Sequence, residues 1–484
     1  MNRTRLAITA LVIAAATGAA VGLSGCGAAQ GEKSASDPAA AAIERPKLRD
    51  CDIGAAGTWR CGQIEVPAVR ADPDIGTQKI SFALRPRDDR SRPSKGTIVF
   101  IEGGPGFAAT NADSIRPTVA VFAPFLRRHE LIAIDQRGTG LSSPLLCAEL
   151  QRGRVPQQKA LAACAKKLGP RFQAYTTAES AADVEAVRRA IALPKRKMIL
   201  YGDSYGTYLG QSYAARYGEG MKGLILSSAY PISGESPFWP SLYPAAKRAV
   251  RLACRRLPDC SGNAVGRLKR TMKLIGTGST FVSNILGYLM GDAASYAPNG
   301  YHRLNAAVSA WLGGNRVPLR ELTDPGPPGA GSPRYYSEGM YYATICNDYP
   351  TPWDRQSAIP DRRRQLQQAV KDFRPRNYWA PVPVGVWVRD PASDIDNCIT
   401  WPAPTGNMEK PVPSGVKMPG NLKTLVLAGE FDSITTVKEA RMVNLRFPQG
   451  RLFVVANRGH ASELYYPFTS RATDRIRQFV NNLG

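Results

Sequence analysis

Histidine is scarce in this sequence, with three among 484 residues, His129, His302 and His460. No two cysteines stand in a CxxC arrangement. Because zinc sites draw their ligands from closely spaced cysteines and histidines, we expect no zinc site. Nothing in the sequence implies another metal or an organic cofactor. We therefore expect that any catalysis depends on amino-acid side chains alone.

Acidic residues are also in short supply, 39 against 63 lysines and arginines, which gives a formal net charge of +24. Such an excess suggests a nucleic-acid partner in a cytosolic protein. However, no arginine-rich tract or aromatic–basic repeat stands out, and the N-terminus carries an export signal. We therefore expect no nucleic-acid partner. We interpret the basic stretches as solvated helix faces that favour an anionic membrane or wall surface: Lys247–Arg248, Arg255–Arg256 and Arg362–Arg364.

The N-terminus has the pattern of a secretory signal. Arg3 and Arg5 precede the apolar run 6–23, and Leu-Ser-Gly stands directly before Cys26. This motif resembles a bacterial lipobox, in which the cysteine is acylated and becomes the mature N-terminus. We expect a lipoprotein signal peptide over 1–25, a flexible tether over 26–48, and a protein that Cys26 anchors to the outer face of the cell membrane. Simple secretion and an uncleaved anchor, which needs about 20 apolar residues, are the alternatives.

Eight cysteines remain once Cys26 is set aside, an even number in a compartment that permits disulfides. Sequence alone does not fix their pairing. Proximity favours Cys51–Cys61, Cys147–Cys164 and Cys254–Cys260, which leaves Cys346 for Cys398.

Short apolar runs alternate with helical patterns along most of the chain. Strands followed by helices predict a mostly parallel sheet flanked by helices, joined by right-handed crossovers. Continuous apolar runs such as Thr97 to Ile101 (TIVFI) are typical of strands that are covered on both faces. We expect strands at 63–67, 79–84, 97–101, 131–134, 197–201, 223–227, 424–428 and 452–456, and helices at 178–192, 205–217 and 473–482.

The alternation breaks once. Residues 231–420 lack buried-strand runs and are rich in proline, tryptophan and tyrosine. The chain exceeds the usual size of one compact domain. We therefore expect a core in two parts, 49–230 and 421–484, interrupted by a mixed, mostly helical cap.

The strongest chemical signal is the sequence Gly202-Asp203-Ser204-Tyr205-Gly206, which matches G-x-S-x-G between an expected strand and helix. A sharp turn at this point lifts a serine hydroxyl clear of the sheet, and glycines are needed because backbone approaches backbone. The following helix N-terminus stabilises developing negative charge. Ser204 is therefore the candidate nucleophile.

A second signal, Gly103-Gly104-Pro105-Gly106, directly follows the strand at 97–101. An acyl-transfer enzyme needs two backbone N–H groups that point at the tetrahedral oxyanion. We assign these to Tyr205 and Gly104, since Pro105 has no N–H to donate.

The third signal lies near the C-terminus. Asp432 and His460 each follow a predicted strand, so both are placed at the carboxyl edge of the sheet, where ligands bind in open α/β folds. The chain order serine, acid, histidine is that of α/β-hydrolases. In such a triad the histidine acts as the base and the acid orients it. Glu430 competes with Asp432 for the acid role.

Taken together, GGPG, DQRGTGLS, GDSYGT, GEFDSITT and the final GH resemble the proline-iminopeptidase and tripeptidyl-aminopeptidase branch of the α/β-hydrolases, from about Trp59 to the C-terminus. The resemblance implies an α/β-hydrolase fold, a triad of Ser204, Asp432 and His460, and cleavage of peptides from the free N-terminus under a closing cap. It also implies that the region of Cys346 and Cys398 is of the tripeptidyl type.

The sequence departs from the family pattern at three places. Asp203 puts a carboxylate beside the nucleophile, Ser227-Ser228-Ala229 stands where an Asp-Gly pair is usual, and Ala461 replaces a glycine. These changes affect the expected substrate rather than the triad.

An aminopeptidase also needs an anion to hold the substrate ammonium group. The candidates are four acidic residues of the cap: Asp348, Glu338, Asp394 and Asp396. The leading hypothesis is a serine aminopeptidase. A lipoprotein carboxylesterase or lipase is the alternative, followed by a non-catalytic surface binding protein that kept the fold.

Overall fold

The computed structural model describes residues 45–484 except 259, 327–328, 330, 376–377, 391–392, 407 and 466–467. The expected signal peptide, the lipidation site Cys26 and the tether up to residue 44 lie outside the described residues. No helix in the described part of the chain is long and apolar enough to cross a membrane.

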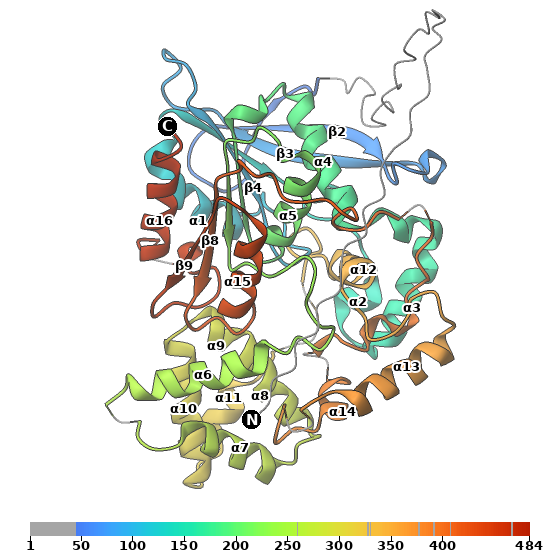
Figure 1. Ribbon diagram of the computed structural model, residues 1–484, viewed down its shortest axis with the longest axis vertical. Coiled ribbons are helices and arrows are strands. Elements are labelled where there is room, and N and C mark those ends of the chain that lie inside the picture. Colours follow the sequence, from blue (N-terminus) through green and yellow to red (C-terminus); the bar gives the residue numbers. More distant parts are fainter. Residues whose placement is uncertain are drawn as a thin grey trace, which may run out of the picture. The chain divides into compact units, whose positions relative to one another are not determined.

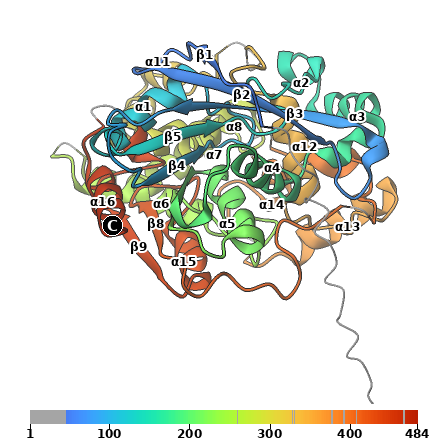
Figure 2. The same cartoon turned by 90° about the horizontal axis from the view of Figure 1, so that it is seen from above.

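A nine-stranded sheet forms the centre of the described chain, in the order β1-β2-β3-β5-β4-β6-β7-β8-β9 (Figures 1 and 2). The first three strands pair in antiparallel fashion, and β3 is antiparallel to β5. The other six are parallel to one another. The strands are β1 (Arg49–Cys51), β2 (Trp59–Pro67), β3 (Thr77–Arg85), β4 (Gly96–Ile101), β5 (His129–Ile134), β6 (Met198–Asp203), β7 (Gly223–Ser227), β8 (Thr424–Gly429) and β9 (Gly450–Val455).

Helices cover both faces of the sheet, which explains the continuous apolar runs. Every residue of β4, β6, β7 and β8 is buried. One face packs against α4 (Thr177–Ala190), α5 (Tyr205–Tyr217) and α15 (Val437–Arg446). The other face packs against α1 (Ala112–Phe122) and α16 (Arg471–Asn481) (Figure 1). The predicted mostly parallel sheet with flanking helices is present.

The segment between β7 and β8 is helical, and the structure assigns no strand to its described residues. Its helices form two groups (Figure 1). The first comprises α6 (Leu242–Arg255), α7 (Ala264–Ile275), α8 (Thr280–Met290), α9 (Asp292–Ser295), α10 (Asn299–Leu312) and α11 (Val317–Leu322). The second comprises α12 (Glu338–Asp348), α13 (Ile359–Asp372) and α14 (Val384–Trp387).

An earlier part of the chain joins the second group. Helices α2 (Ala148–Arg152) and α3 (Gln157–Leu168) lie in the crossover from β5 to β6, yet their apolar side chains belong to the same buried cluster as those of the cap. Leu161 of α3 and Met340 of α12 are both fully buried in this cluster. The cap helices therefore pack against α2 and α3, which belong to the first part of the core.

Four disulfides each fasten elements within one part of the chain, and their pairings are those predicted from the sequence. Cys51–Cys61 joins β1 to β2, Cys147–Cys164 joins the start of α2 to α3, and Cys254–Cys260 closes the end of α6. Cys346–Cys398 fastens α12 to a short 3₁₀ helix, η7 (Asn397–Thr400).

Candidate active site

Ser204 occupies the sharp turn between β6 and α5. Its backbone has φ 49° and ψ −122°, a conformation that non-glycine residues rarely adopt and that is typical of strained functional positions. The turn is so tight that a Cβ on Gly202 would lie 2.4 Å from the carbonyl oxygen of Gly206, so this position requires glycine. The serine thus stands at the N-terminus of α5, where the helix dipole favours negative charge.

The GGPG loop lies directly against this turn. A Cβ on Gly103 would be 2.8 Å from the Cβ of Ser204, so only glycine permits this approach. Gly104 and Ser204 line the same cavity. Tyr205 is the first residue of α5, and the N–H groups of a first helical turn have no partner within the helix. The structure thus places both predicted oxyanion donors beside the serine.

Asp432 and His460 meet at the carboxyl edge of the sheet, after β8 and β9. Nδ1 of His460 lies 3.0 Å from Oδ2 of Asp432. The buried carboxylate also accepts hydrogen bonds from the N–H groups of Ile434 and Thr435, both 2.9 Å away, and from the Thr435 hydroxyl. These contacts fix the carboxylate in place and leave it to orient the imidazole.

The two groups shift one another's pKa in opposite directions. Burial alone would raise the pKa of Asp432, but the charge and hydrogen bond of His460, together with the hydrogen bonds from Thr435, hold the pKa below its usual value. Burial alone would lower the pKa of His460, but the charge and hydrogen bond of Asp432, together with the charges of Glu463 and Glu102, raise the pKa above its usual value. The pair therefore favours the imidazolium form that a general base reaches during catalysis.

Glu430, the competing acid, is engaged elsewhere. Its carboxylate lies 2.9 Å from Arg256 and 3.4 Å from Arg248, and it accepts a hydrogen bond from the N–H of Asn457. The structure therefore puts Asp432, not Glu430, on the imidazole.

The histidine loop is held from two sides. The N–H of His460 donates to the carbonyl oxygen of Ala294 in α9, at 3.1 Å. The N–H of Ala461 donates to Oγ of Ser228, at 2.7 Å. Ser228 and Ala461 are two of the positions where the sequence departs from the family pattern, and the structure shows them in contact with each other.

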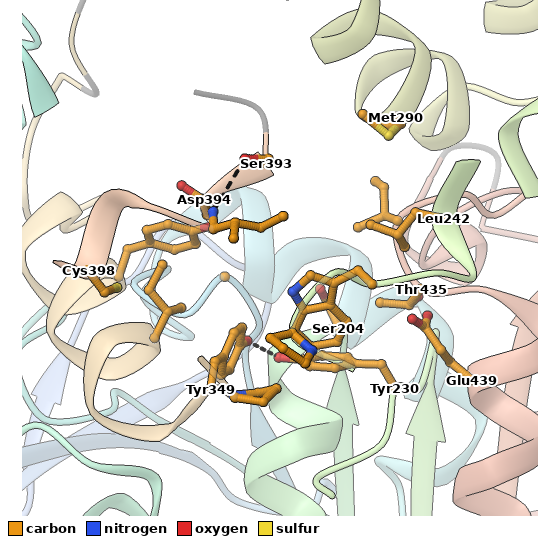
Figure 3. Close-up of a pocket in the computed structure, with 18 of the residues that line it drawn as sticks. Ser204, Tyr230, Leu242, Met290, Tyr349, Ser393, Asp394, Cys398, Thr435 and Glu439 are labelled. Carbon is orange, nitrogen blue, oxygen red and sulfur yellow. Dashed lines mark hydrogen bonds between the residues drawn. The ribbon is translucent and has the colours of Figure 1, made fainter. Parts of the chain in front are cut away.

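A cavity of about 250 Å³ opens in front of Ser204, between the sheet edge and the cap (Figure 3). The Tyr230 and Tyr349 hydroxyls are hydrogen-bonded to one another on its wall. Most of the lining is apolar or aromatic, as is usual for ligand sites, and two carboxylates, Asp394 and Glu439, interrupt it. Other lining residues include Gly104, Trp239, Leu242, Met290, Tyr341, Ile345, Ile395 and Thr435.

Of the four predicted anchor residues, Asp394 lines this cavity. It accepts hydrogen bonds from the hydroxyls of Tyr341 and Tyr342, at 2.6 and 3.2 Å, and from the amide of Asn397 at 2.8 Å. Burial raises the pKa of Asp394. Burial and the Asp394 charge raise the pKa of Glu338 to about 7, so these two acids share one electrostatic environment.

The other two predicted anchors lie elsewhere. Asp348 accepts hydrogen bonds from both the N–H and the hydroxyl of Thr177, whose Oγ lies 2.8 Å from the Tyr205 hydroxyl. Asp348 therefore fixes the start of α4. Asp396 lines a separate hollow together with Arg363 and Arg389.

Sequence reasoning missed Glu439. It is fully buried, lines the cavity, and completes a capping box with Thr436 at the start of α15. Ser241 also donates to it, at 2.6 Å, and burial raises its pKa to about 7. The T-x-x-E capping signal is visible in the sequence, but the position of that helix start on the cavity is not.

The Asp135–Gly140 turn has a structural task. Asp135 accepts hydrogen bonds from Thr110 and from the N–H of Leu141. Arg137 is completely buried and pairs with Asp183, at 2.7 Å. The turn thus ties the end of β5 to α4.

No group of three or more histidine, cysteine, aspartate or glutamate side chains in the described ranges is arranged to hold a metal ion. Nδ1 of His129 lies 3.2 Å from the carbonyl oxygen of Phe125, and His302 lies on α10.

Comparison with known proteins agrees with this geometry. The family described as "alpha/beta hydrolase fold" matches residues 96–265, which include Ser204, and the family described as "TAP-like protein" matches residues 383–481, which include Asp432 and His460.

Several characterised relatives match over most of the chain. The serine protease Hip1 of Mycobacterium tuberculosis is 24% identical over 433 residues, covering 78% of this chain and 77% of its own length. The tripeptidyl aminopeptidase of Streptomyces coelicolor is 23% identical over 446 residues, covering 83% of this chain and 77% of its own. The proline iminopeptidase of Neisseria meningitidis is 27% identical over 152 residues, 31% of this chain and 38% of its own.

A solved proline iminopeptidase from Mycobacterium smegmatis aligns with a TM-score of 0.37 at 14% identity, over 90% of this chain and 98% of that one. The family matches and the relatives confirm the predicted fold and enzyme class. The chain is a serine hydrolase of the α/β-hydrolase superfamily, of the peptidase type.

Proposed function

We propose that the chain is a serine aminopeptidase that cleaves peptides from the free N-terminus through an acyl-enzyme on Ser204. The observation that carries the proposal is the 3.0 Å contact between His460 and Asp432, at the sheet edge where Ser204 opens into a capped cavity. The aminopeptidase names of the relatives support the same reading.

The residues divide the reaction as follows. Nε2 of His460 takes the proton of the Ser204 hydroxyl as its oxygen attacks the scissile carbonyl, while Asp432 holds Nδ1–H and stabilises the imidazolium. The N–H groups of Gly104 and Tyr205 bind the oxyanion. The imidazolium then protonates the departing amine, and water, activated by the same imidazole, hydrolyses the acyl-enzyme.

The substrate ammonium group binds on the cap side of the cavity. Asp394 is placed there, and the nearby Glu338 adds negative charge once it ionises. The tyrosine hydroxyls of Tyr341 and Tyr342 hold the Asp394 carboxylate in position. We propose release of short N-terminal peptides of the tripeptidyl type, because the TAP-like match covers Asp394 and both C-terminal triad residues.

We also propose that Cys26 carries the lipid anchor and that the enzyme acts outside the cytoplasmic membrane. The lipobox-like motif supports this placement, as do four disulfides, which form in oxidising compartments. Mass spectrometry of the mature N-terminus tests the anchor: an acylated Cys26 is expected, and an intact Met1 would refute it.

The activity is tested with matched tripeptidyl and aminoacyl amides whose N-terminus is free or acetylated. Cleavage of the free forms and loss of activity in Ser204→Ala are expected. Equal cleavage of the acetylated amides would refute recognition of a free N-terminus, and rapid cleavage of acyl esters with no amide cleavage would favour an esterase.

A further inference from the structure

Three acidic residues outside the triad lie at the ends of the strands that carry the candidate site or in the loops after them. Glu102 follows β4 and precedes the GGPG loop, Asp203 precedes Ser204, and Glu463 follows His460 within a 3₁₀ helix, η8 (Ser462–Leu464). All three are buried, with 7%, 4% and 1% of their surface exposed. Such residues are costly unless they are paired or neutral.

Glu463 has a donor of its own, because the Tyr201 hydroxyl donates to it at 2.8 Å. Glu102 and Asp203 differ. They directly follow Ile101 and Gly202, which pair across the adjacent parallel strands β4 and β6, so the two carboxyl groups are neighbours at one edge of the sheet. Oδ2 of Asp203 lies 3.3 Å from the point that a Cβ on Gly103 would occupy. Oε2 of Glu102 and Oδ1 of Asp203 have no hydrogen-bond partner among the described residues.

Two ionised carboxylates can only accept hydrogen bonds, so in that state neither satisfies the other. One proton between them changes this, since the protonated acid donates to its neighbour. Like charges in contact also disfavour double ionisation. Burial and the Glu102 charge raise the pKa of Asp203 well above its ordinary value, and burial raises that of Glu102.

We propose that Glu102 and Asp203 share one proton and act together as positioning residues that hold the oxyanion loop against the nucleophile. Oε1 of Glu102 accepts the N–H of Gly103 at 2.9 Å, and Gly103 abuts Ser204. The hydrogen bond to Asp203 then links this loop to the residue before the nucleophile. The inference rests on the proposed function in giving Ser204 and Gly104 their catalytic roles.

The shared proton also sets the local charge. The titratable groups whose charges act on the pair or feel it are Glu463 and His460 after β9, Tyr201 on β6, Tyr335 before α12, and Tyr465 before α16. With one proton the pair keeps a single negative charge, which supports the His460 imidazolium. Loss of that proton at alkaline pH places two like charges between the loops and moves Gly103 from Ser204.

The first test does not depend on activity and uses the full mature chain with Ser204→Ala. Near pH 8 the infrared spectrum should contain a protonated-carboxyl C=O stretch that Glu102→Gln and Asp203→Asn each remove. At that pH most of Glu338 and Glu439, whose pKa values are about 7, has ionised. A spectrum in which neither substitution removes such a band overturns the proposal.

The same proteins are unfolded by heat across a pH series. A carboxyl group whose pKa is higher in the folded than in the unfolded protein stabilises the fold at low pH. This contribution to the free energy of unfolding is lost as the pH rises from the unfolded-state pKa towards the folded-state pKa. Glu102→Gln should therefore flatten the decline of the melting temperature with rising pH, whereas Glu65→Gln, on the exposed side of β2, should leave it unchanged. Equal slopes in the Ser204→Ala parent, Glu102→Gln and Glu65→Gln overturn the proposal.

Activity provides the test of positioning. In Glu102→Gln the amide N–H donates to Asp203 at every pH, so fluorophosphonate labelling of Ser204 should stay near wild type and lose its alkaline decline. Glu102→Ala breaks the link, and kcat should fall on the order of 100-fold with a smaller change in KM. Equal damage in both variants overturns positioning by the shared proton. Failure of the aminopeptidase proposal alone would leave the infrared and thermal results intact.

Discussion

The backbone N–H of His460 donates to the carbonyl oxygen of Ala294, 3.1 Å away, and thereby joins the histidine loop to helix α9 of the cap. Gly459, the residue before His460, also packs tightly against this carbonyl. A Cβ on Gly459 would lie 1.7 Å from the same oxygen, so only glycine fits here. The position of the imidazole thus depends on a helix that is far away in the sequence.

Gly459→Ala should separate the loop from α9. We expect kcat to fall on the order of 100-fold, and the free energy of unfolding to drop by about 1–3 kcal/mol. Gly287→Ala, in α8, is the control, because a Cβ there meets nothing within 4 Å. Steady-state kinetics and denaturant unfolding of both variants decide the matter, and a fully active Gly459→Ala would contradict the role of this contact.

Asp432→Asn should remove the charge that orients and stabilises His460. We expect kcat to fall on the order of 10⁴-fold with little change in KM. Glu430→Gln should leave kcat near its wild-type value, because Glu430 pairs with Arg248 and Arg256. The reverse order of effects would transfer the acid role to Glu430.

The pH profile of kcat/KM should rise along an acid limb as His460 loses its proton. Burial lowers the pKa of His460, but Asp432, with Glu463 and Glu102, raises it, so the midpoint should lie above the ordinary value of about 6.5. In Asp432→Asn burial remains without the carboxylate, and the midpoint should move to lower pH. Measuring both profiles checks the sign, and an upward shift in the variant would be inconsistent with the pairing.

Asp394→Asn should weaken binding of a free N-terminus. A buried charge pair is worth about 2–5 kcal/mol when one partner is removed, so kcat/KM for free-amine peptides should fall by at least about 30-fold. Hydrolysis of a small neutral ester should change little, which separates anchoring from chemistry.

Asp396→Asn is the matched control for that variant, because Asp396 lines a different hollow. It should retain wild-type discrimination between free and acetylated N-termini. If both variants lose it equally, the amine is held by some other group, and Glu439 on the opposite wall is the next to substitute.

The central strands could be predicted because both of their faces are buried. The expected strand at 424–428 is β8 (Thr424–Gly429), and the run at 97–101 lies within β4 (Gly96–Ile101). The candidate triad could be placed from local motifs, since Ser204 directly follows β6 and the loops after β8 and β9 carry Asp432 and His460. Strand β1 (Arg49–Cys51) escaped prediction because it is three residues long and mostly exposed.

Other features depend on packing that the sequence does not display. Asp348 was a reasonable candidate for the ammonium anchor, but its carboxylate binds Thr177 in a helix 171 residues earlier. Glu439 entered the cavity only through the placement of α15. Likewise, the burial of α2 and α3 with the cap helices could not be inferred from their position between two core strands.

The hydrogen bond from Ala461 to Ser228 has a consequence for how relatives of this chain are found. A pattern that demands Asp-Gly after the seventh strand and glycine after the histidine would reject this chain at two positions that one hydrogen bond joins. The two positions are better scored as a linked pair, with a serine hydroxyl at one permitting a backbone turn at the other.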